Sequence, residues 1–271
     1  MRKLMLLLAG LAAAFAVGVG PATAVTDGEL DGDRHPAVVL VLMDVGGQPA
    51  FRCSGTLIAP KYVLTAGHCA GEPGEFSGIR IFTESDVQNG DNTYPFAGGP
   101  NSVEAVRWAS HPQYTNAQFF LHDVGMIQLS KAVKLPKGAY GTLPSTNQLD
   151  SLRPSSSTTF TAVGYGLQKS FPTAADWKEE RQRIRMLAFP HLIQINGGIV
   201  GDFSLLLSNN ANTGGTCFGD SGGPNYLGGV TSTLVAGVTS FGLNGTCGGT
   251  GGVFRVDRQN VLNFINGFMN P

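Results

Sequence analysis

One stretch decides how this chain is interpreted: Gly215-Thr216-Cys217-Phe218-Gly219-Asp220-Ser221-Gly222-Gly223-Pro224. It places a single serine among four glycines, beside an acid and a cysteine. Glycine adopts backbone conformations closed to other residues and lets another molecule approach the main chain. Ser221 is therefore expected to be exposed, with amides of the same loop directed at one point near its oxygen. This is the geometry of acyl transfer, in which a nucleophile lies beside a site that binds an oxyanion.

The order of the residues along the chain narrows the range of possible folds. A nucleophilic serine needs a histidine base and an acid that orients the histidine. All five histidines precede Ser221, namely His35, His68, His111, His122 and His191. An α/β-hydrolase also carries its serine in a Gly-x-Ser-x-Gly turn, but its histidine follows the serine. That fold is therefore excluded for Ser221, and the order His, Asp, Ser remains.

The composition favours an all-β protein. Of the 271 residues, 14% are charged and 38 are glycine, as suits short strands joined by tight turns. The 18 basic and 19 acidic residues nearly balance, so we expect no nucleic-acid partner. Strands are predicted at 37–43, 51–58, 62–66, 78–82, 102–108, 121–129, 159–163, 181–189, 194–199, 233–241 and 252–256.

Domain organisation follows from one polar segment. Residues 131–158 are rich in Lys, Pro, Ser and Thr and are the best linker candidate. We expect a first β-barrel over 25–134, a linker over 135–158 and a second β-barrel over 159–256. The only convincing helix is predicted over 257–268, with Asp257 as its N-cap, and it begins a C-terminal segment over 257–271.

The first 24 residues are typical of a signal peptide. Arg2 and Lys3 precede an apolar stretch, Leu4–Val19, and Ala22-Thr23-Ala24 offers a cleavage site. The alternative is a membrane anchor, but the apolar stretch is shorter than the roughly 20 residues that span a bilayer. We therefore expect a secreted protein with no membrane association in its mature form.

Export also bears on the four cysteines. An oxidising compartment predicts two disulfides, for which three pairings exist. Cys53 and Cys69 flank the predicted hairpin of 51–58 and 62–66, which would bring them together and leave Cys217 to pair with Cys247. No Cys-x-x-Cys spacing is present, so we expect neither a metal site nor a cofactor.

Three segments resemble the signature segments of the chymotrypsin-like (trypsin-like) serine endopeptidases. They are Leu64-Thr65-Ala66-Gly67-His68-Cys69, Asp123-Val124-Gly125-Met126-Ile127-Gln128-Leu129 and Gly219-Asp220-Ser221-Gly222-Gly223-Pro224. Their order and spacing also match, and the resemblance extends from Val25 to the C-terminal helix. It implies two perpendicular six-stranded antiparallel β-barrels with a catalytic cleft between them.

The resemblance also implies roles for individual residues. Ser221 would be the nucleophile, His68 the general base and Asp123 the acid that orients His68. The amides of Gly219 and Ser221 would form the oxyanion hole, and the Cys217–Cys247 disulfide would brace the substrate pocket. His122 lies next to Asp123, but we interpret it as a strand residue that points to the opposite face.

A further implied pair concerns activation. In the family, the acid next to the nucleophile binds the new N-terminal ammonium of the processed chain. Here that acid is Asp220, and Val25-Thr26-Asp27-Gly28 is similar to the family's mature start, with Asp27 where glycine is usual. Because Val25 directly follows the predicted cleavage site, signal peptidase itself would release the activating ammonium.

The substrate pocket is expected to be open and uncharged. By resemblance its lining comprises Gly215, Thr216, Ser240, Phe241, Gly242 and Gly252. A trypsin-type enzyme carries aspartate at the position of Gly215, and glycine cannot pair with a basic side chain. Large apolar or aromatic residues are therefore expected before the scissile bond.

Two other interpretations remain open. The chain could be a protease-fold binding module without turnover, or an esterase-like hydrolase that uses the same site. The presence of His68, Asp123 and Ser221 together favours an enzyme. We expect peptide or protein substrates as its partners, and a monomer.

Overall fold

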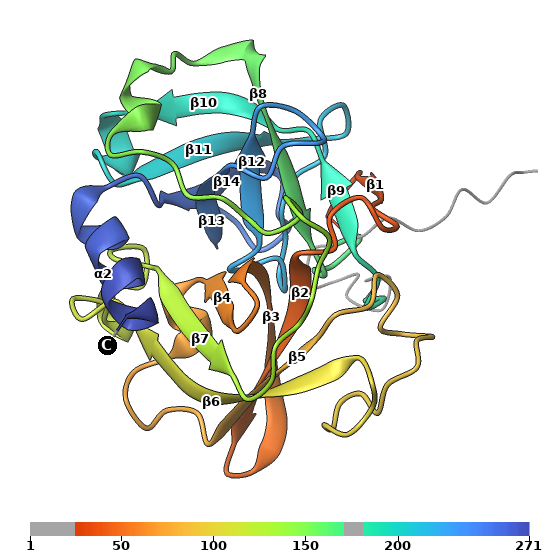
Figure 1. Cartoon of the computed structure of the whole chain (residues 1–271). Coiled ribbons are helices and arrows are strands. Elements are labelled where there is room, and N and C mark those ends of the chain that lie inside the picture. The colour runs from red at the N-terminus through yellow and green to blue at the C-terminus, as the bar shows by residue number, and fades with distance from the viewer. Residues whose placement is uncertain (1–24, 171–180, 271) are drawn as a thin grey trace, which may run out of the picture.

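The computed structural model describes residues 25–170 and 181–270. The predicted signal peptide lies outside these residues. In the described part of the chain, strands dominate and form two barrels that pack against each other (Figure 1).

The first barrel is a closed ring of six antiparallel strands in the order β2-β3-β4-β7-β6-β5. The strand bounds are β2 (Val38–Val45), β3 (Gln48–Ala59), β4 (Tyr62–Thr65), β5 (Gly78–Phe82), β6 (Ser102–Ser110) and β7 (Gly125–Leu129). The short helix α1 (Gly67–Ala70) follows β4 directly and carries His68. The hairpin of β3 and β4 therefore delivers His68 to one end of this barrel.

The second barrel is also closed. Its strands are β8 (Ser155–Gly164), β9 (Met186–Ala188), β10 (His191–Ile195), β11 (Ser204–Asn209), β12 (Pro224–Leu227), β13 (Val235–Gly242) and β14 (Gly249–Arg255). The sheet runs from β8 through β10, β11, β14 and β13 to β12, and β12 pairs back with β8. β9 pairs with the edge of β8 that also pairs with β10, and on its other side β9 pairs with the two-residue strand β1 (Glu29–Leu30). The predicted fold class of two six-stranded antiparallel β-barrels is confirmed.

Helices play a small part in the fold. Besides α1, the described residues contain α2 (Gln259–Met269) and three 3-10 turns, η1 (Asn116–Gln118), η2 (Gln148–Ser151) and η4 (Gly198–Val200). α2 follows the second barrel in sequence but packs on the first (Figure 1). The Tyr62 hydroxyl donates to the Met269 carbonyl over 3.1 Å, and the Arg107 guanidinium donates to the Phe268 carbonyl. The C-terminal helix therefore fastens the two barrels together.

The largest apolar cluster spans both barrels, and a separate cluster that includes Phe160 and Leu205 lies in the second. The largest cluster includes Leu40 and Ile127 from the first barrel, Tyr226 and Val238 from the second, and Ile265 from α2. Each large apolar side chain that is fully buried contributes about 1.5–3 kcal/mol relative to exposure. This shared core fixes the two barrels relative to each other, and with them the loops at their junction.

Several element boundaries differ from the predictions. The strand predicted over 121–129 begins only at Gly125, because His122 adopts φ 55°, which breaks an extended strand. Of the stretch predicted as a strand over 181–189, only Met186–Ala188 is one, since Ile184 makes an isolated bridge with Asp86 instead. β8 begins at Ser155, inside the predicted linker. β11 and β12 were not predicted, and β12 starts at a proline, a position that a strand tolerates.

The predicted cap of the C-terminal helix is wrong. The N-cap of α2 is Arg258, and no side chain caps this helix end. The Asp257 carboxylate instead accepts two hydrogen bonds from Arg255, at 2.9 and 2.8 Å, and one from the Leu149 amide. Arg255 also binds Asp150 at 2.8 Å. A fully buried guanidinium therefore joins β14, the inter-barrel connection and the start of α2.

This buried cluster gives a stability prediction. We expect Arg255→Met to lower the free energy of unfolding by about 3–5 kcal/mol, because Asp257 would remain buried without its cation. Urea denaturation in a Ser221→Ala background measures the change. The matched control is Arg153→Met at an exposed arginine of the connection, expected to change stability by less than about 0.5 kcal/mol. Equal losses in both variants would contradict the role of Arg255.

Candidate active site

The predicted catalytic residues meet at the junction of the two barrels. His68 and Ser221 line one cavity of about 650 Å³, here called the substrate cavity. Its wall from the first barrel includes Tyr114 and Phe119, and its wall from the second includes Thr216 and Ser240. Residues that are far apart in sequence are therefore brought to a single cleft.

Asp123 is the buried anchor of this cleft. Its carboxylate accepts the main-chain N–H of His68 at 2.9 Å and contacts the His68 Nδ1 at 3.0 Å. The Ser240 hydroxyl, from β13 of the second barrel, donates to the same carboxylate over 2.5 Å. Since a carboxylate accepts hydrogen bonds, Nδ1 carries the ring hydrogen, and Nε2 is the nitrogen left to take a proton.

The surroundings of His68 change its basicity. Burial lowers the pKa of His68, but the negative charge of Asp123 and the hydrogen bond to it outweigh burial. The pKa is therefore raised above the ordinary value of 6.5. The ring nevertheless reaches solvent, because 26% of the side chain is exposed. Such a partly exposed base with a raised pKa is suited to proton transfer near neutral pH.

The loop that carries Ser221 is held from both barrels. The Ser54 amide on β3 donates to the Ser221 carbonyl over 2.7 Å. Gly222 has φ 77°, and a Cβ added there would lie 2.0 Å from the Thr65 hydroxyl and 2.5 Å from the Ser54 carbonyl oxygen. Only glycine fits at this position, so the Gly-rich sequence is required by close packing against the first barrel.

Two amides beside the serine are free to bind a ligand. Within the described part of the chain, the N–H groups of Gly219 and Ser221 have no hydrogen-bond acceptor. Gly219 has φ 97°, a conformation that favours glycine, and its carbonyl accepts a hydrogen bond from the Ser54 hydroxyl. Both residues are half-buried, and two unpaired amides next to a nucleophile are typical of an oxyanion site.

Asp220 supports this loop from beneath. Its two carboxylate oxygens accept hydrogen bonds from the amides of Gly166 and Cys217, each at 2.8 Å. Burial raises the pKa of Asp220 to about 7, and the hydrogen bonds from Cys217 and Gly166, together with the Arg52 charge, only partly offset it. Val25 is fully buried against Met186 and Ala188, but its nitrogen is an amide as long as Ala24 precedes it. The pairing of Val25 with Asp220 therefore stays a prediction.

The lining of the substrate cavity agrees in part with the prediction. Thr216, Ser240, Phe241 and Gly242 line it, and Gly215 and Gly252 do not. A Cβ on Gly252 would lie 2.4 Å from the Phe241 ring, and one on Gly215 would lie 2.2 Å from the Asn209 amide carbon. The space expected beside both glycines is thus filled by neighbouring side chains.

Part of the apolar lining was not predicted from the sequence. The described residues that also line the cavity include Phe119, Phe218 and Leu243, each of which is exposed. The Phe120 ring meets the Phe241 ring edge-on at 6.4 Å. A large apolar residue on a glycine-rich loop, such as Phe218 between Cys217 and Gly219, is the signal that could have identified this lining.

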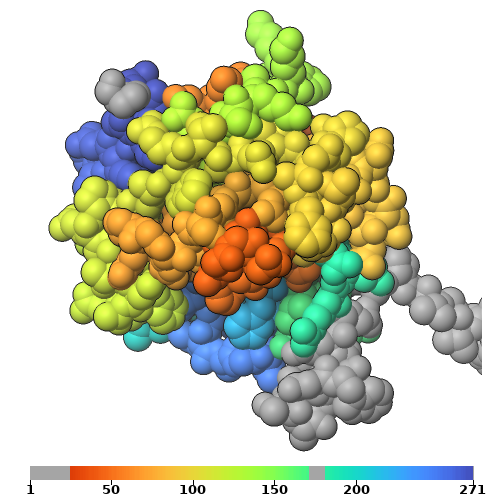
Figure 2. Space-filling view, turned by 90° about the horizontal axis from the view of Figure 1, so that it is seen from below, coloured from red at the N-terminus to blue at the C-terminus, as the bar shows by residue number. Residues whose placement is uncertain are grey.

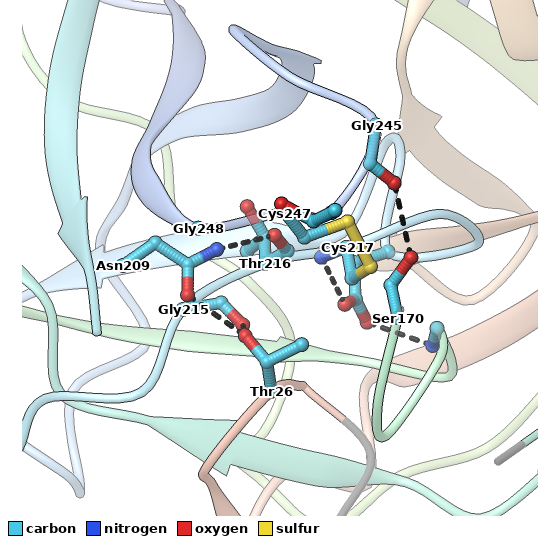
Figure 3. Close-up of a disulfide and its surroundings, with 12 residues drawn as sticks. Thr26, Ser170, Asn209, Gly215, Thr216, Cys217, Gly245, Cys247 and Gly248 are labelled. Atoms are coloured by element: carbon cyan, nitrogen blue, oxygen red, sulfur yellow. Dashed lines mark hydrogen bonds between the residues drawn. A yellow bond between two sulfur atoms is a disulfide. The ribbon is translucent and has the colours of Figure 1, made fainter. Parts of the chain in front are cut away.

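A disulfide braces one wall of the cavity (Figure 3). It joins Cys217 to Cys247, with a Cα–Cα distance of 5.3 Å. Behind it, the Asn209 side chain donates to the Thr216 carbonyl and accepts from the Thr26 hydroxyl, at 2.8 and 2.7 Å. The cavity wall is therefore tied to Thr26, the residue that follows Val25.

The second disulfide joins Cys53 to Cys69, next to His68. The sulfur atoms of these cysteines lie near the His68 ring, a grouping that could otherwise suggest a metal site. Both sulfurs are in the disulfide, so neither can serve as a thiolate ligand. The grouping therefore offers no thiolate to a metal ion.

The neighbouring histidines lie apart from this arrangement. His122 is not in a strand, contrary to the prediction, and its ring stacks on that of His111 at 5.0 Å. Burial lowers the pKa of His122, and burial together with the charge of His122 lowers the pKa of His111. In the described residues, neither histidine forms a hydrogen bond with the Asp123 carboxylate.

Comparison with known proteins identifies the family of this chain. A family model described as Trypsin matches residues 31–265. The chain belongs to the trypsin family. This is a family of serine endopeptidases, and relatives of this trypsin-family chain include chymase and brachyurin.

The relatives are distant. Chymase of Canis lupus familiaris is 27% identical over 201 residues, which cover 71% of this chain and 69% of chymase. Brachyurin of Leptuca pugilator is 27% identical over 197 residues, which cover 72% of this chain and 77% of brachyurin. The matched part is only 16% of the serine protease Hayan of Drosophila melanogaster and 60% of the venom serine protease Bi-VSP of Bombus ignitus.

A solved structure supports the same fold. That of HL collagenase superimposes with a TM-score of 0.69 at 21% sequence identity. The superposition covers 91% of this trypsin-family chain and 99% of the collagenase chain. At this identity the likeness concerns the fold alone.

The packing of the serine loop gives a second prediction. We expect Gly222→Ala to lower the free energy of unfolding by more than about 3 kcal/mol, because a positive φ costs about 1–2 kcal/mol and a collision with main-chain atoms adds to it. The control is Gly229→Ala, which has φ 94° but no heavy atom within 4 Å of the added Cβ. Urea denaturation of both variants in the Ser221→Ala background measures the difference. If the two variants lose the same stability, the close contact with Thr65 and Ser54 is not the constraint.

Proposed function

We propose that this chain is a secreted serine endopeptidase that cleaves peptide bonds through Ser221, His68 and Asp123. The observation that carries the proposal is the buried Asp123, which binds both the main chain and the ring of His68. Ser221 lines the substrate cavity beside two unpaired amides. Family membership adds support, because the relatives include several named serine proteases.

The proposed reaction has two halves. In the first, His68 Nε2 takes the proton of the Ser221 hydroxyl as its oxygen attacks the substrate carbonyl carbon. The oxyanion that forms accepts hydrogen bonds from the Gly219 and Ser221 amides, each worth about 3 kcal/mol in the transition state. Asp123 stabilises the imidazolium. His68 then donates the proton to the leaving amine as the C–N bond breaks.

The second half releases the acyl group. A water molecule gives a proton to His68 Nε2 and attacks the acyl carbon bound to Ser221. The same two amides stabilise the second oxyanion. When the bond to Ser221 breaks, the proton returns to the serine oxygen, and the enzyme is restored with a free carboxylic acid product.

The residue before the scissile bond is proposed to be large and apolar or aromatic. The described residues that line the substrate cavity carry no Asp, Glu, Lys or Arg. Phe119, Phe218 and Phe241 supply apolar surface, so an apolar side chain gains by leaving water. A basic side chain would find no counter-charge there.

Secretion and activation are proposed together. The described residues include two disulfides, which persist in oxidising compartments. They include no helix that is long and apolar enough to cross a membrane. Cleavage after Ala24 would create an ammonium at Val25, and binding of this cation would lower the pKa of the buried Asp220.

A labelling experiment separates this proposal from the alternatives. We expect a fluorophosphonate to label the chain, and Ser221→Ala to abolish labelling, because Ser221 is the activated nucleophile. Digestion of a peptide library by the same preparation tests endopeptidase activity and should show cleavage after Phe, Leu or Tyr rather than after Lys or Arg. A binding module would show neither result. An esterase-like hydrolase would be labelled but would leave the peptides intact.

The pH dependence tests the role of Asp123. Activity is expected to fall toward low pH as His68 is protonated, with a midpoint above 6.5 because Asp123 raises its pKa. Asp123→Asn should reduce kcat/KM about 10⁴-fold and move the midpoint to lower pH, since the charge that raises the pKa is lost. The control is His122→Asn, at the adjacent residue, expected to change kcat/KM less than about twofold because asparagine tolerates positive φ. A midpoint that is unchanged in Asp123→Asn would exclude the assigned role.

A further inference from the structure

A second cavity of about 730 Å³ lies across the Phe218–Gly219 segment from the substrate cavity. We call it the arginine cavity, because its lining includes Arg52, Arg181, Arg183, Phe51, Tyr94 and Phe218. Figure 2 shows this side of the molecule, where the orange and yellow segments of the first barrel meet the turquoise segment that follows residue 180. Nothing in the proposed chemistry uses these arginines.

The position of the arginine cavity relates it to the substrate. Phe218 lines both cavities and separates them. If the residue before the scissile bond occupies the substrate cavity and its carbonyl meets the Gly219 amide, the chain after the scissile bond must continue past Gly219. On that side lies Arg52, next to Cys53, which is joined to Cys69 beside His68. His68 protonates the leaving amine, so the arginine cavity faces the leaving part of the substrate.

The edge of β3 can guide that part of the substrate. The Ser54 amide donates to Ser221 and the Ser54 carbonyl accepts from Thr65, so both groups point away from β2. Main-chain groups alternate in direction along a strand, so those of Arg52 point to the same side as those of Ser54. An extended peptide can pair with this edge and would then carry its side chains past the arginines.

Arg52 and Arg183 bring two positive charges close to the oxyanion loop. A Cβ on Gly219 would lie 3.3 Å from Arg52 Nε, so this guanidinium is beside the oxyanion loop. Burial lowers the pKa of Arg52, and the nearby Arg183 charge lowers it further against the raising effects of Tyr94 and Asp220. Arg183 lies over the Tyr94 ring at 4.9 Å, and its buried Nε has no acceptor in the described residues.

Neither Arg52 nor Arg183 forms an ion pair with a carboxylate within 25–170 and 181–270. Arg181 has a partner of its own, so the argument rests on the other two. Two neighbouring guanidinium groups repel each other, and a carboxylate placed between them relieves the repulsion and accepts charge-assisted hydrogen bonds. The structure therefore assigns the arginine cavity as a subsite for an acidic substrate residue, Asp or Glu, among the first three residues after the scissile bond. This assignment rests on the proposed endopeptidase function.

The test compares peptides that share the same sequence before the scissile bond. Each carries Glu, Gln or Lys at the first, second or third position after it. At one of these positions we expect kcat/KM for Glu to exceed that for Gln about five- to tenfold, and Lys to be the poorest, as for a partly buried charge pair. The Glu-to-Lys ratio should fall as salt is raised, because ions screen the attraction. This wild-type measurement needs no variant.

Charge reversal identifies the residue responsible. Arg183→Glu should lower the Glu-to-Lys ratio at least tenfold, so that Lys is preferred. The ratio compares two peptides cleaved by one variant, so a general loss of activity cancels. Arg153→Glu makes the same charge change at an exposed arginine of the inter-barrel connection and should keep the wild-type ratio.

The outcomes are distinguishable. Equal cleavage of the Glu, Gln and Lys peptides by the wild-type chain would overturn the acidic subsite and leave the endopeptidase function intact. A preference for Glu that persists in Arg183→Glu would overturn the assignment to the arginine cavity. Absence of cleavage of every peptide, together with absence of fluorophosphonate labelling, would overturn the endopeptidase function itself.

Discussion

The fully buried carboxylate of Asp123 is the interaction on which the site depends. It has hydrogen bonds to the main chain and ring of His68 in the first barrel and to the Ser240 hydroxyl in the second. A buried charge that loses its partners is strongly destabilising, so these contacts are maintained together. The same contacts orient the His68 ring and fix the two barrels at the cleft. The contacts of Asp123 therefore determine both the position of the His68 ring and the packing of the two barrels at the cleft.

A second buried carboxylate, Asp220, holds the serine loop by hydrogen bonds, as Asp123 holds the histidine. It binds the amides of Gly166 and Cys217, and the loop that results leaves the Gly219 and Ser221 amides unpaired. Burial raises its pKa to about 7, far above the ordinary value of an aspartate. An ammonium at Val25 is the cation that would lower this pKa, which links the proposed cleavage after Ala24 to the shape of the oxyanion site.

The sequence predicts most of the fold and the central site because these depend on local patterns and chain order. The hairpin between Cys53 and Cys69 is local, and the absence of histidine after Ser221 excludes the competing fold without structural information. What escaped prediction depends on long-range packing. The positive φ of His122 delays β7, the Phe241 ring fills the space beside Gly252, and Arg255 draws Asp257 away from the helix end. The proximity of Arg52 and Arg183 in one cavity likewise cannot be read from a linear pattern.

In the proposed mechanism, the acyl part of the substrate is bound covalently to Ser221 until water releases it. Mixing the chain with a slowly hydrolysed ester of an aromatic acid and quenching in acid should trap this species. Intact mass spectrometry is then expected to show one added acyl group, and peptide mapping should place it on Ser221 and find none in Ser221→Ala. Rapid turnover of the ester with no acyl group on Ser221 would contradict the account.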